Sequence, residues 1–286
     1  MERADLDGLM LEYEVAGHGE PVSFIHGALI AETFRPLLAE PALTDCHHLV
    51  RYHRRGYAGS THTRGRMTVA QHAADCHALL RHLGIERAHL VGHSYGGVVA
   101  LQLALDAPAV VHSLALLEPA IVANSGVQAY REALERGEQR FREANAEQVI
   151  DEFFQPRFGS GYRALLDRIL PGAFAQAVAD AETWFERESP ALREWDFGEA
   201  DLRRVTQPVL AVQGQESAAL WPRFGETHRL LLASLPQSEG FILPGATHLL
   251  QTQNPRGMAE ALAAYFASHP MPDHRSRRQV VDTDGP

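Results

Sequence analysis

The sequence contains no lysine, so arginine provides all 26 of its strongly basic residues. A chain without lysine has no Schiff-base lysine, no P-loop lysine and no Ser-Lys catalytic pair, and mechanisms that depend on those groups are excluded. Cysteine is also scarce. Cys46 and Cys76 are the only two in 286 residues, and they show neither a metal-ligand spacing nor a disulfide framework. We therefore expect no metal site.

Long apolar runs and an excess of positive charge are missing as well. The most apolar long stretch, residues 98–117, is interrupted by Gln102, Asp106, Pro108 and His112, so it is not a membrane span. The N-terminal residues lack the apolar core of a secretory signal. The formal net charge of −10 disfavours nucleic acid and anionic membrane surfaces as partners. These absences predict a cytoplasmic protein that binds neither nucleic acid nor membranes.

What is present is an alternation of short β-type runs and amphipathic helical patterns. Thr68 and Gln71 form a capping box at the start of one helix, and Gly84 ends it. Strands that alternate with helices indicate an α/β fold with a parallel sheet covered on both faces. The predicted strands are 9–15, 22–26, 49–53, 88–91, 111–117, 208–212 and 241–243, and the predicted helices are 68–83, 98–105 and a final one that starts at Asn254.

The pattern changes between residues 121 and 203, where helical periodicity occurs without a convincing strand. This segment holds eleven of the 22 aromatic residues in less than a third of the chain. We therefore expect a helical cap domain at 121–203, inserted into a core domain made of residues 1–120 and 204–269. Residues 270–286 are polar and rich in proline, and we expect them to form a disordered tail.

The run Gly92-His93-Ser94-Tyr95-Gly96 follows an apolar strand and precedes an apolar helix. A G-x-S-x-G sequence in this setting predicts a sharp strand-to-helix turn that lifts the serine hydroxyl above the sheet. The helix N-terminus also favours negative charge that develops beside the serine. Ser94 is therefore the predicted nucleophile.

These features resemble the α/β-hydrolase superfamily over roughly residues 8–268. The other matching motifs are His26-Gly27 after an early strand, the run Arg-Arg-Gly-Tyr-Ala-Gly-Ser at 54–60 and the run Gly-Ala-Thr-His at 245–248. The resemblance implies an α/β-hydrolase fold, in which helices flank a mostly parallel sheet and a helical cap follows the sixth strand. His53 departs from the pattern, because the family usually has an aspartate before this arginine.

The resemblance also assigns roles to residues. His248 is the candidate general base, since it follows a late strand, and it would take the Ser94 proton and return it to the leaving group. The backbone N–H groups of Ala28 and Tyr95 would hold the oxyanion of a tetrahedral intermediate. The residues expected to contact the substrate are His26, Gly27, His93, Trp184 and Phe185.

The acid of the triad is a harder assignment. Most family members carry an aspartate a few residues after the glycine that ends the seventh strand, but this position is Ser217 here. Glu118 ends the strand after the elbow strand, at the same edge of the sheet as Ser94. Some relatives, including certain haloalkane dehalogenases and a lactonase of fungal macrolides, place a glutamate there. We predict Glu118, with its rival Glu216 beside the vacated position. Asp106 is excluded because it lies about 18 Å along a helix from Ser94.

The predicted function is hydrolysis of a carboxylic ester or lactone of a hydrophobic small molecule through an acyl-enzyme, without a cofactor. The aromatic cap is expected to line an apolar pocket for an uncharged acyl or alcohol group. A serine nucleophile disfavours the haloalkane dehalogenase and ordinary epoxide hydrolase reactions, which use an aspartate in its place. We expect a monomer or homodimer.

Four alternatives stay open. They are a C–C bond hydrolase, a perhydrolase-like enzyme, a biosynthetic enzyme of thioester release or cyclisation, and a slow-turnover signalling protein that binds a ligand on the same fold. The C–C bond hydrolase would need a cap arginine for a substrate carboxylate. Five arginines are available and none stands out in the sequence: Arg131, Arg140, Arg157, Arg163 and Arg187.

Overall fold

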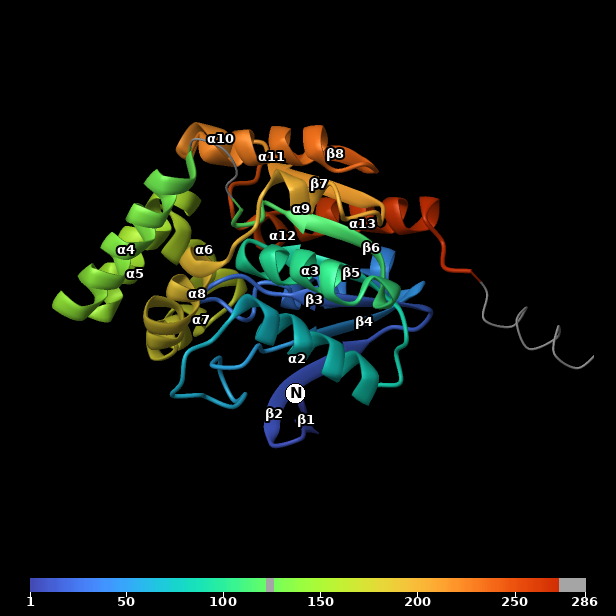
Figure 1. Cartoon of the computed structure of the whole chain (residues 1–286), viewed down its shortest axis with the longest axis horizontal. Coiled ribbons are helices and arrows are strands. Elements are labelled where there is room, and N and C mark those ends of the chain that lie inside the picture. Colours follow the sequence, from blue (N-terminus) through green and yellow to red (C-terminus); the bar gives the residue numbers. More distant parts are fainter. Residues whose placement is uncertain (122–125, 273–286) are drawn as a thin grey trace, which may run out of the picture.

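The central element of the fold is an eight-stranded β-sheet (Figure 1). A computed structural model describes residues 1–121 and 126–272 of the chain. The strands are β1 (Glu2–Leu6), β2 (Leu9–Ala16), β3 (Glu20–Ile25), β4 (His47–Tyr52), β5 (Ala88–His93), β6 (Val111–Leu117), β7 (Val209–Gly214) and β8 (Ser238–Leu243). Their order is β1-β2-β4-β3-β5-β6-β7-β8; β2 runs antiparallel to both of its neighbours and all other neighbouring strands are parallel. The predicted α/β fold with a mostly parallel sheet is confirmed.

The strands differ in how deeply they are buried, and this explains which strands can be predicted from the sequence. β5 and β7 are buried at every position, because helices cover both faces of the central sheet. β1 is absent from the predicted strands. It is an edge strand that pairs only with β2, and most of its residues are exposed. Its sequence, Glu-Arg-Ala-Asp-Leu, therefore carries too little apolar periodicity to be distinguished from a loop.

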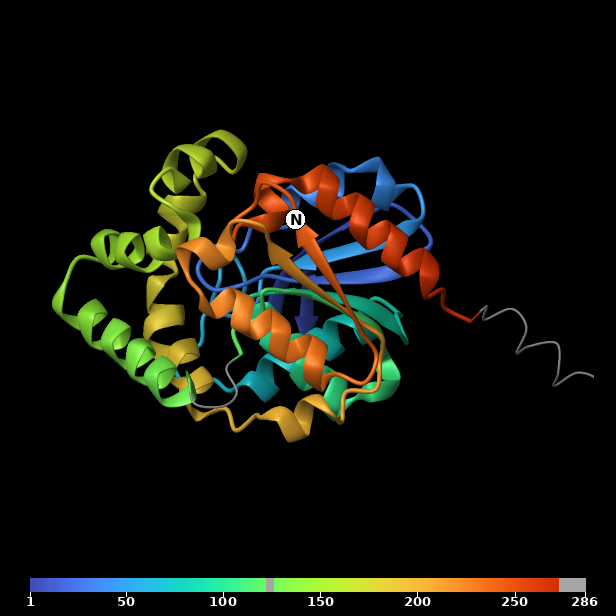
Figure 2. The same ribbon diagram turned by 90° about the horizontal axis from the view of Figure 1, so that it is seen from above.

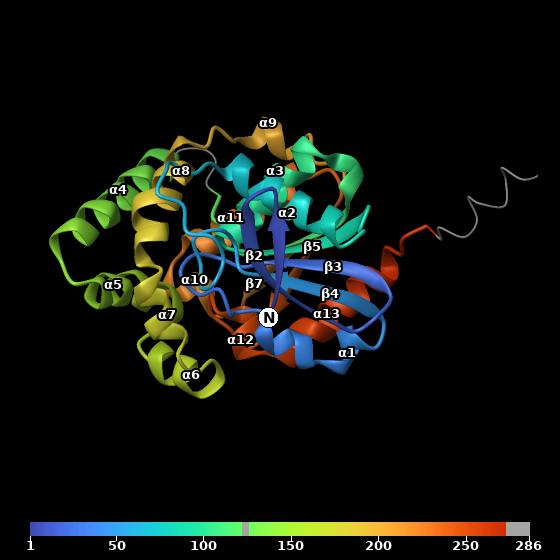
Figure 3. The ribbon, with the colours of Figure 1, turned by 90° about the horizontal axis from the view of Figure 1, so that it is seen from below.

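Helices cover both faces of the sheet, as Figure 3 shows. One face carries α2 (Val69–His82), α3 (Tyr95–Asp106), α9 (Glu199–Leu202) and α11 (Arg223–Ser234). The other face carries η1 (Arg35–Ala39), α1 (Pro41–Thr44), α12 (Leu250–Gln253) and α13 (Pro255–Ser268). Two short helices lie in the connections, η2 (Pro108–Val110) before β6 and α10 (Ser217–Leu220) after β7. The predicted capping box is present at the start of α2, where Thr68 and Gln71 exchange side-chain-to-backbone hydrogen bonds.

A group of helices between β6 and β7 lies beyond one end of the sheet (Figure 2). We call residues 127–194 the helical segment; it contains α4 (Val127–Glu143), α5 (Ala146–Phe158), α6 (Tyr162–Ile169), α7 (Ala173–Ala179), the π-helical η4 (Thr183–Glu188) and α8 (Ser189–Glu194). Residues 122–125 of the predicted cap and 273–286 of the predicted tail lie outside the described residues. The domain boundaries stay a prediction. None of the described helices is long and apolar enough to cross a membrane.

The interior of the sheet contains a histidine whose titration affects stability. His89 on β5 is inaccessible to solvent, and its Nδ1 lies 2.7 Å from Oγ of Ser113. Burial, reinforced by neighbouring His112, lowers the pKa of His89 to about 3. Glu20 lies 3.2 Å from the ring, but it is 33% exposed, so water screens its charge. The folded protein therefore keeps His89 neutral at a pH where the unfolded chain protonates it.

We expect His89 to make the protein less stable as the pH falls below about 6.5, the ordinary pKa of histidine. Between that value and the folded pKa of about 3, the unfolded state binds the extra proton, so stability falls with decreasing pH by about 1.4 kcal/mol per pH unit. The measurement is urea unfolding at pH ~7, ~6 and ~5. His89→Gln should show a pH slope smaller by that amount, and the exposed-site control His18→Gln should keep the wild-type slope. Equal slopes for all three proteins would contradict the prediction.

Candidate active site

Ser94 lies in a strained turn between β5 and α3. Its backbone angles are φ 51° and ψ −116°, a conformation that non-glycine residues rarely adopt and that costs roughly 1–3 kcal/mol. The turn needs glycine at two positions. A Cβ at Gly96 would lie 1.9 Å from the carbonyl oxygen of Ile25, and a Cβ at Gly97 would lie 2.7 Å from Cβ of Pro119. The motif therefore forms the sharp strand-to-helix turn that its sequence predicts.

The segments that follow the C-terminal ends of strands β5 and β6 are hydrogen-bonded to each other at Ser94. The N–H of Ser94 donates to the carbonyl of Leu117 at 3.0 Å, and its carbonyl accepts the N–H of Ala120 at 3.0 Å. Glu118 lies between Leu117 and Ala120, just after the end of β6, and has a positive φ of 44°. Both strained residues are thus held at the same edge of the sheet.

Glu118 contacts His248 directly. Oε2 of Glu118 lies 2.6 Å from Nδ1 of His248, and Oε1 accepts the N–H of Gly214 at 2.8 Å. A carboxylate can only accept, so Nδ1 of His248 carries the proton and Nε2 is left as the basic nitrogen. His93, the residue before Ser94, donates from its ring to the carbonyl of His248 at 2.7 Å. This bond fixes the histidine beside the nucleophile turn.

Burial determines the protonation of this pair. It lowers the pKa of His248 well below 6.5, and the guanidinium groups of Arg157 and Arg223 lower this pKa further. Burial also raises the pKa of Glu118 to about 7, against the opposing effect of the Ser217 hydroxyl. A neutral imidazole is the form that accepts a proton from a serine, so His248 is suited to general-base chemistry at neutral pH.

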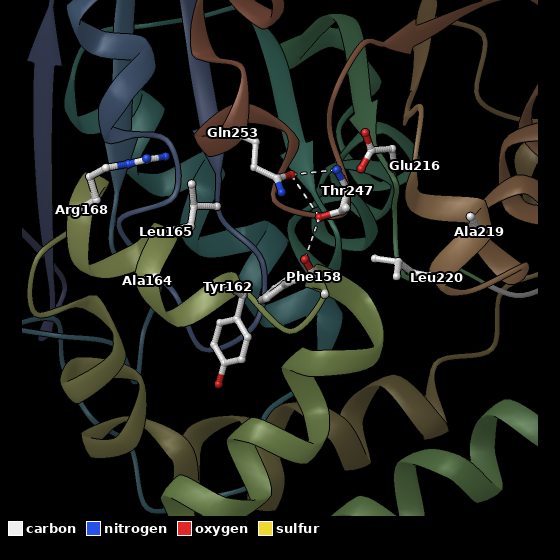
Figure 4. Close-up of a pocket in the computed structure, with 12 residues that line it drawn as sticks. Phe158, Tyr162, Ala164, Leu165, Arg168, Glu216, Ala219, Leu220, Thr247 and Gln253 are labelled. Carbon is white, nitrogen blue, oxygen red and sulfur yellow. Dashed lines mark hydrogen bonds between the residues drawn. The ribbon is translucent and has the colours of Figure 1, made fainter.

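Glu216, the rival acid, lies elsewhere. It is exposed and lines a solvent-open pocket of about 620 Å³ between α6 and α10, together with Tyr162 and Arg168 (Figure 4). Its carboxylate makes no hydrogen bond or ion pair with the part of the chain that the structure describes. Nδ1 of His248 is already occupied by Glu118. The geometry therefore favours Glu118 over Glu216.

The loop after β3 packs closely against Ser94, the predicted nucleophile. A Cβ placed on Gly27 would lie 3.1 Å from Cβ of Ser94, so the missing side chain allows this approach. Outside the regular helices and strands, no backbone hydrogen bond between described residues uses the N–H of Ala28 or of Tyr95. Unused N–H groups beside the nucleophile are what an oxyanion hole requires.

A buried ion pair connects this loop to the helical segment. The guanidinium of Arg54 donates to the carbonyl of Gly27 at 2.9 Å and pairs with the carboxylate of Glu188. The two side chains are 1% and 0% exposed. Tyr57 donates its hydroxyl to Glu188 at 2.6 Å, and Nε2 of His72 lies 3.1 Å from the same carboxylate. The position of the loop therefore depends on a residue contributed by the helical segment.

The predicted substrate contacts His26 and His93 have ring nitrogens that bind the protein itself. Nε2 of His26 accepts the N–H of Arg54 at 3.0 Å, and its Nδ1 lies 2.7 Å from the carbonyl of Gly27. His93 uses its Nε2 on the carbonyl of His248. Both rings position the backbone around the nucleophile, and direct contact with a substrate stays a prediction.

The two predicted aromatic residues of the cap take different positions. Trp184 lies against Tyr95, with ring centroids 5.7 Å apart, and so contacts the residue after the nucleophile. Phe185 stacks on Phe141 at 4.9 Å within the helical segment. Both line a small pocket of about 40 Å³ that also includes Arg157. Trp184 is therefore the better candidate for a substrate contact.

His53, which departs from the family pattern, lies between two carboxylates. Its Nδ1 is 3.2 Å from Glu12 and its Nε2 is 2.6 Å from Glu32. Arg51 also lies 3.1 Å from Glu32. Burial alone would raise the pKa of Glu32, but His53 and Arg51 outweigh it and lower this pKa to about 2. The usual carboxylate of this position is thus replaced by a histidine that is held by acidic neighbours.

Several residues around the site have no role in the sequence analysis. Glu188 is one, because its local sequence carries no recognisable motif and its partner Arg54 is 134 residues away. The rings of Phe158 and Phe224 are two others; they stack on His248 with centroid distances of 5.9 Å and 4.4 Å. Within the described ranges, no group of three or more His, Cys, Asp or Glu side chains is arranged to hold a metal ion.

Comparison with known proteins gives consistent matches. The family model described as alpha/beta hydrolase fold matches residues 20–255. The dihydrolipoyllysine-residue acetyltransferase component of the acetoin cleaving system of Cupriavidus necator is 33% identical over 219 residues, 76% of this chain and 55% of that protein. The chain thus spans little more than half the length of this relative.

Two solved structures share the fold. The enol-lactonase from Burkholderia xenovorans LB400 has a TM-score of 0.80 at 19% identity, and the match covers 93% of this chain and 100% of that one. A thermophilic esterase from Thermogutta terrifontis has a TM-score of 0.77 at 24% identity, covering 94% and 100%. At these identities the similarity shows the architecture alone.

Glu188→Gln should strongly destabilise the protein, because it leaves the buried cation of Arg54 without a counter-charge. Removing one partner of a buried ion pair typically costs about 3–5 kcal/mol. The free energy of unfolding from urea titration measures the effect. Glu194→Gln is the matched control, since it breaks the exposed pair with Arg66, whose side chains are 61% and 81% exposed, and should change stability little. A Glu188→Gln protein as stable as the control would show that this pair is not needed.

Proposed function

This chain belongs to the alpha/beta hydrolase fold family, and on that premise we propose that it is a serine hydrolase that cleaves a carboxylic ester or lactone through an acyl-enzyme. One observation carries the proposal. Glu118 lies 2.6 Å from Nδ1 of His248, at the strand edge where the turn presents Ser94. A nucleophile, a neutral base and a buried carboxylate that orients the base are the parts that acyl transfer requires.

The proposed reaction uses each group once in each half. Oγ of Ser94 attacks the carbonyl carbon while Nε2 of His248 takes its proton, and Glu118 stabilises the imidazolium that forms. The N–H groups of Ala28 and Tyr95 bind the oxyanion. His248 then gives the proton to the oxygen of the leaving alcohol. In the second half, His248 deprotonates a water molecule, which attacks the acyl-enzyme and releases the carboxylic acid and the serine hydroxyl.

The proposed substrate has an apolar body. Trp184, Phe153 and Phe185 lie close together in the helical segment next to the nucleophile turn, and we assign this segment the role of a cap over the site. An ester or lactone also agrees with the names of the similar structures, an enol-lactonase and an esterase. The cytoplasmic location and the monomeric or homodimeric state remain predictions.

Ser94→Ala should reduce kcat for a p-nitrophenyl ester by roughly 10⁴–10⁶-fold, because the acyl-enzyme can no longer form. Glu118→Gln should lose about 10⁴-fold, since an amide neither orients His248 in the required tautomer nor stabilises its cation. Steady-state release of p-nitrophenol measures both losses. Mass spectrometry of the protein quenched during turnover should show the acyl group on Ser94.

Glu216→Gln is the matched control, because this neighbouring glutamate lies outside the triad contact, and it should retain nearly full activity. Near-complete loss in Glu216→Gln together with retained activity in Glu118→Gln would overturn the assignment of the acid. Hydrolysis that survives in Ser94→Ala would overturn the serine mechanism.

The acidic limb of the pH profile of kcat/KM should follow the protonation of Glu118. Burial raises the pKa of Glu118 to about 7, whereas burial and the cations of Arg157 and Arg223 hold the pKa of His248 well below 6.5. As the pH falls from about 8 to about 6, Glu118 therefore takes up the proton and no longer stabilises the imidazolium, so kcat/KM should fall with a midpoint near pH ~7. Initial rates at low substrate concentration across this range measure the profile, and a rate that stays constant down to pH ~6 would contradict the protonation state described above.

A further inference from the structure

Two arginines beside the candidate triad have no acidic partner. Arg157 lies near the end of α5 and Arg223 begins α11. Among residues 1–121 and 126–272, neither guanidinium comes within the 4.0 Å ion-pair distance of an Asp or Glu side chain. The buried arginines Arg51 and Arg54 differ, since each is paired with glutamate.

The hydrogen bonds of the two arginines are also incomplete. Arg157 donates to the carbonyl of Phe153, and Arg223 donates from Nη2 to the carbonyl of Ile121 at 3.1 Å. Nη1 of Arg223 is buried and has no hydrogen-bond partner in the described residues. A guanidinium has five N–H donors, and the hydrogen bonds above use one on each arginine, so the other donors can bind water or a ligand.

Both side chains are half-buried, and partial removal of their charges from water is unfavourable in the free protein. Burial, together with the charge of Arg223, lowers the pKa of Arg157 to about 9, and burial lowers the pKa of Arg223 as well. Buried charges are normally paired, because the free energy of removing them from water is otherwise uncompensated. An anionic ligand would supply the missing counter-charge.

Aromatic rings lie against both guanidinium groups. Arg157 lies 3.8 Å from the ring centroid of Phe153 and 4.2 Å from that of Trp221. Arg223 lies 3.3 Å from Tyr130 and 5.3 Å from Trp221. Stacking uses the π-faces, whereas the N–H donors point outward in the plane. A planar carboxylate binds guanidinium in this plane, through paired hydrogen bonds.

The pair lies next to the candidate catalytic residues. Phe158 and Phe224, which follow the two arginines in sequence, stack on the ring of His248, and the N–H of His248 donates to the carbonyl of Arg157 at 3.4 Å. Arg157 also lines the small pocket of about 40 Å³ with Trp184. One water molecule needs roughly 10–15 Å³ of such a cavity, so this pocket has room for only a small terminal group.

We propose that Arg157 and Arg223 together bind a carboxylate of the substrate, and that the preferred substrate is an ester or lactone bearing this second, anionic group away from the scissile carbonyl. The inference rests on the proposed function and narrows its substrate class. The apolar body of the substrate contacts the aromatic rings, while its carboxylate accepts hydrogen bonds from the guanidinium edges. The substrate is then amphipathic, which differs from the uncharged group expected from aromatic content alone.

The test compares two esters that differ at the end away from the scissile bond, the mono-p-nitrophenyl ester of glutaric acid, which carries a carboxylate there, and the same compound with that carboxylate masked as an uncharged methyl ester. The wild-type enzyme should prefer the anionic ester, measured as the ratio of the two kcat/KM values. Arg157→Gln and Arg223→Gln should each lower this ratio by about 10²-fold, mainly through KM for the anionic ester. Arg157→Lys should lose less. Arg142→Gln, an exposed arginine of α4 without an ion-pair partner in the described residues, should leave the ratio unchanged.

A ratio that stays at the wild-type value in both Arg157→Gln and Arg223→Gln would overturn the inference, and would assign the two charges to the electrostatics of His248 instead. Thermal melting identifies a variant that fails to fold, and the other variant then decides. Glutarate binding to Ser94→Ala, measured by calorimetry, separates this inference from the proposed function. If neither ester is hydrolysed in a Ser94-dependent way, the proposed function fails. Glutarate binding that Arg157→Gln abolishes would still support the carboxylate site in that case. Absence of glutarate binding would contradict the carboxylate site.

Discussion

The buried guanidinium of Arg54 is the charge on which the arrangement of the site depends. It holds the carbonyls of His26 and Gly27, so it fixes the direction of the peptide that follows. A cation 1% exposed requires a counter-charge, and Glu188 of the helical segment provides it. The loop after β3 therefore depends on the helical segment for its position. The interaction links the part of the chain proposed to contact the substrate with the part proposed to stabilise the oxyanion.

Three arginines near the site, one buried and two half-buried, illustrate two different uses of the same side chain. The charge and the N–H donors of Arg54 are paired with protein groups, so this side chain has a structural role. Arg157 and Arg223 lie over aromatic rings but have no carboxylate within ion-pair distance among the described residues. These cation–π contacts offset part of the unfavourable desolvation. Their charges also favour the neutral form of His248, which is the form the proposed mechanism needs.

Much of the fold and of the site is predictable from local sequence, and the rest depends on contacts between distant segments. The strand, turn and helix around Ser94 follow from an apolar run and from glycines at fixed offsets, and both signals are local. β1 has no such signal, because an exposed edge strand lacks apolar periodicity. Glu188 and Arg54 form an ion pair across 134 residues of sequence, and the sequence around neither residue predicts this pair. The sequence around Arg157 does not set it apart from the other arginines of the chain; only its contacts with Phe153 and Trp221 in the folded protein do.

The glutamate at 118 and the serine at 217 are parts of one arrangement. β7 lies between β6 and β8 in the sheet, so a carboxylate at the end of β6 must extend past the end of β7 to reach His248, which follows β8. The end of β7 leaves room for it. Gly214 has no side chain, and a Cβ there would lie 2.5 Å from the carbonyl of Ala246 and 2.6 Å from Oγ of Ser217. Its N–H also binds the arriving carboxylate. An aspartate at 217 would add a second buried negative charge beside Glu118, and like charges at that distance raise each other's pKa. A small neutral residue at 217 therefore allows Glu118, with its longer side chain, to contact His248 in the ionised carboxylate form.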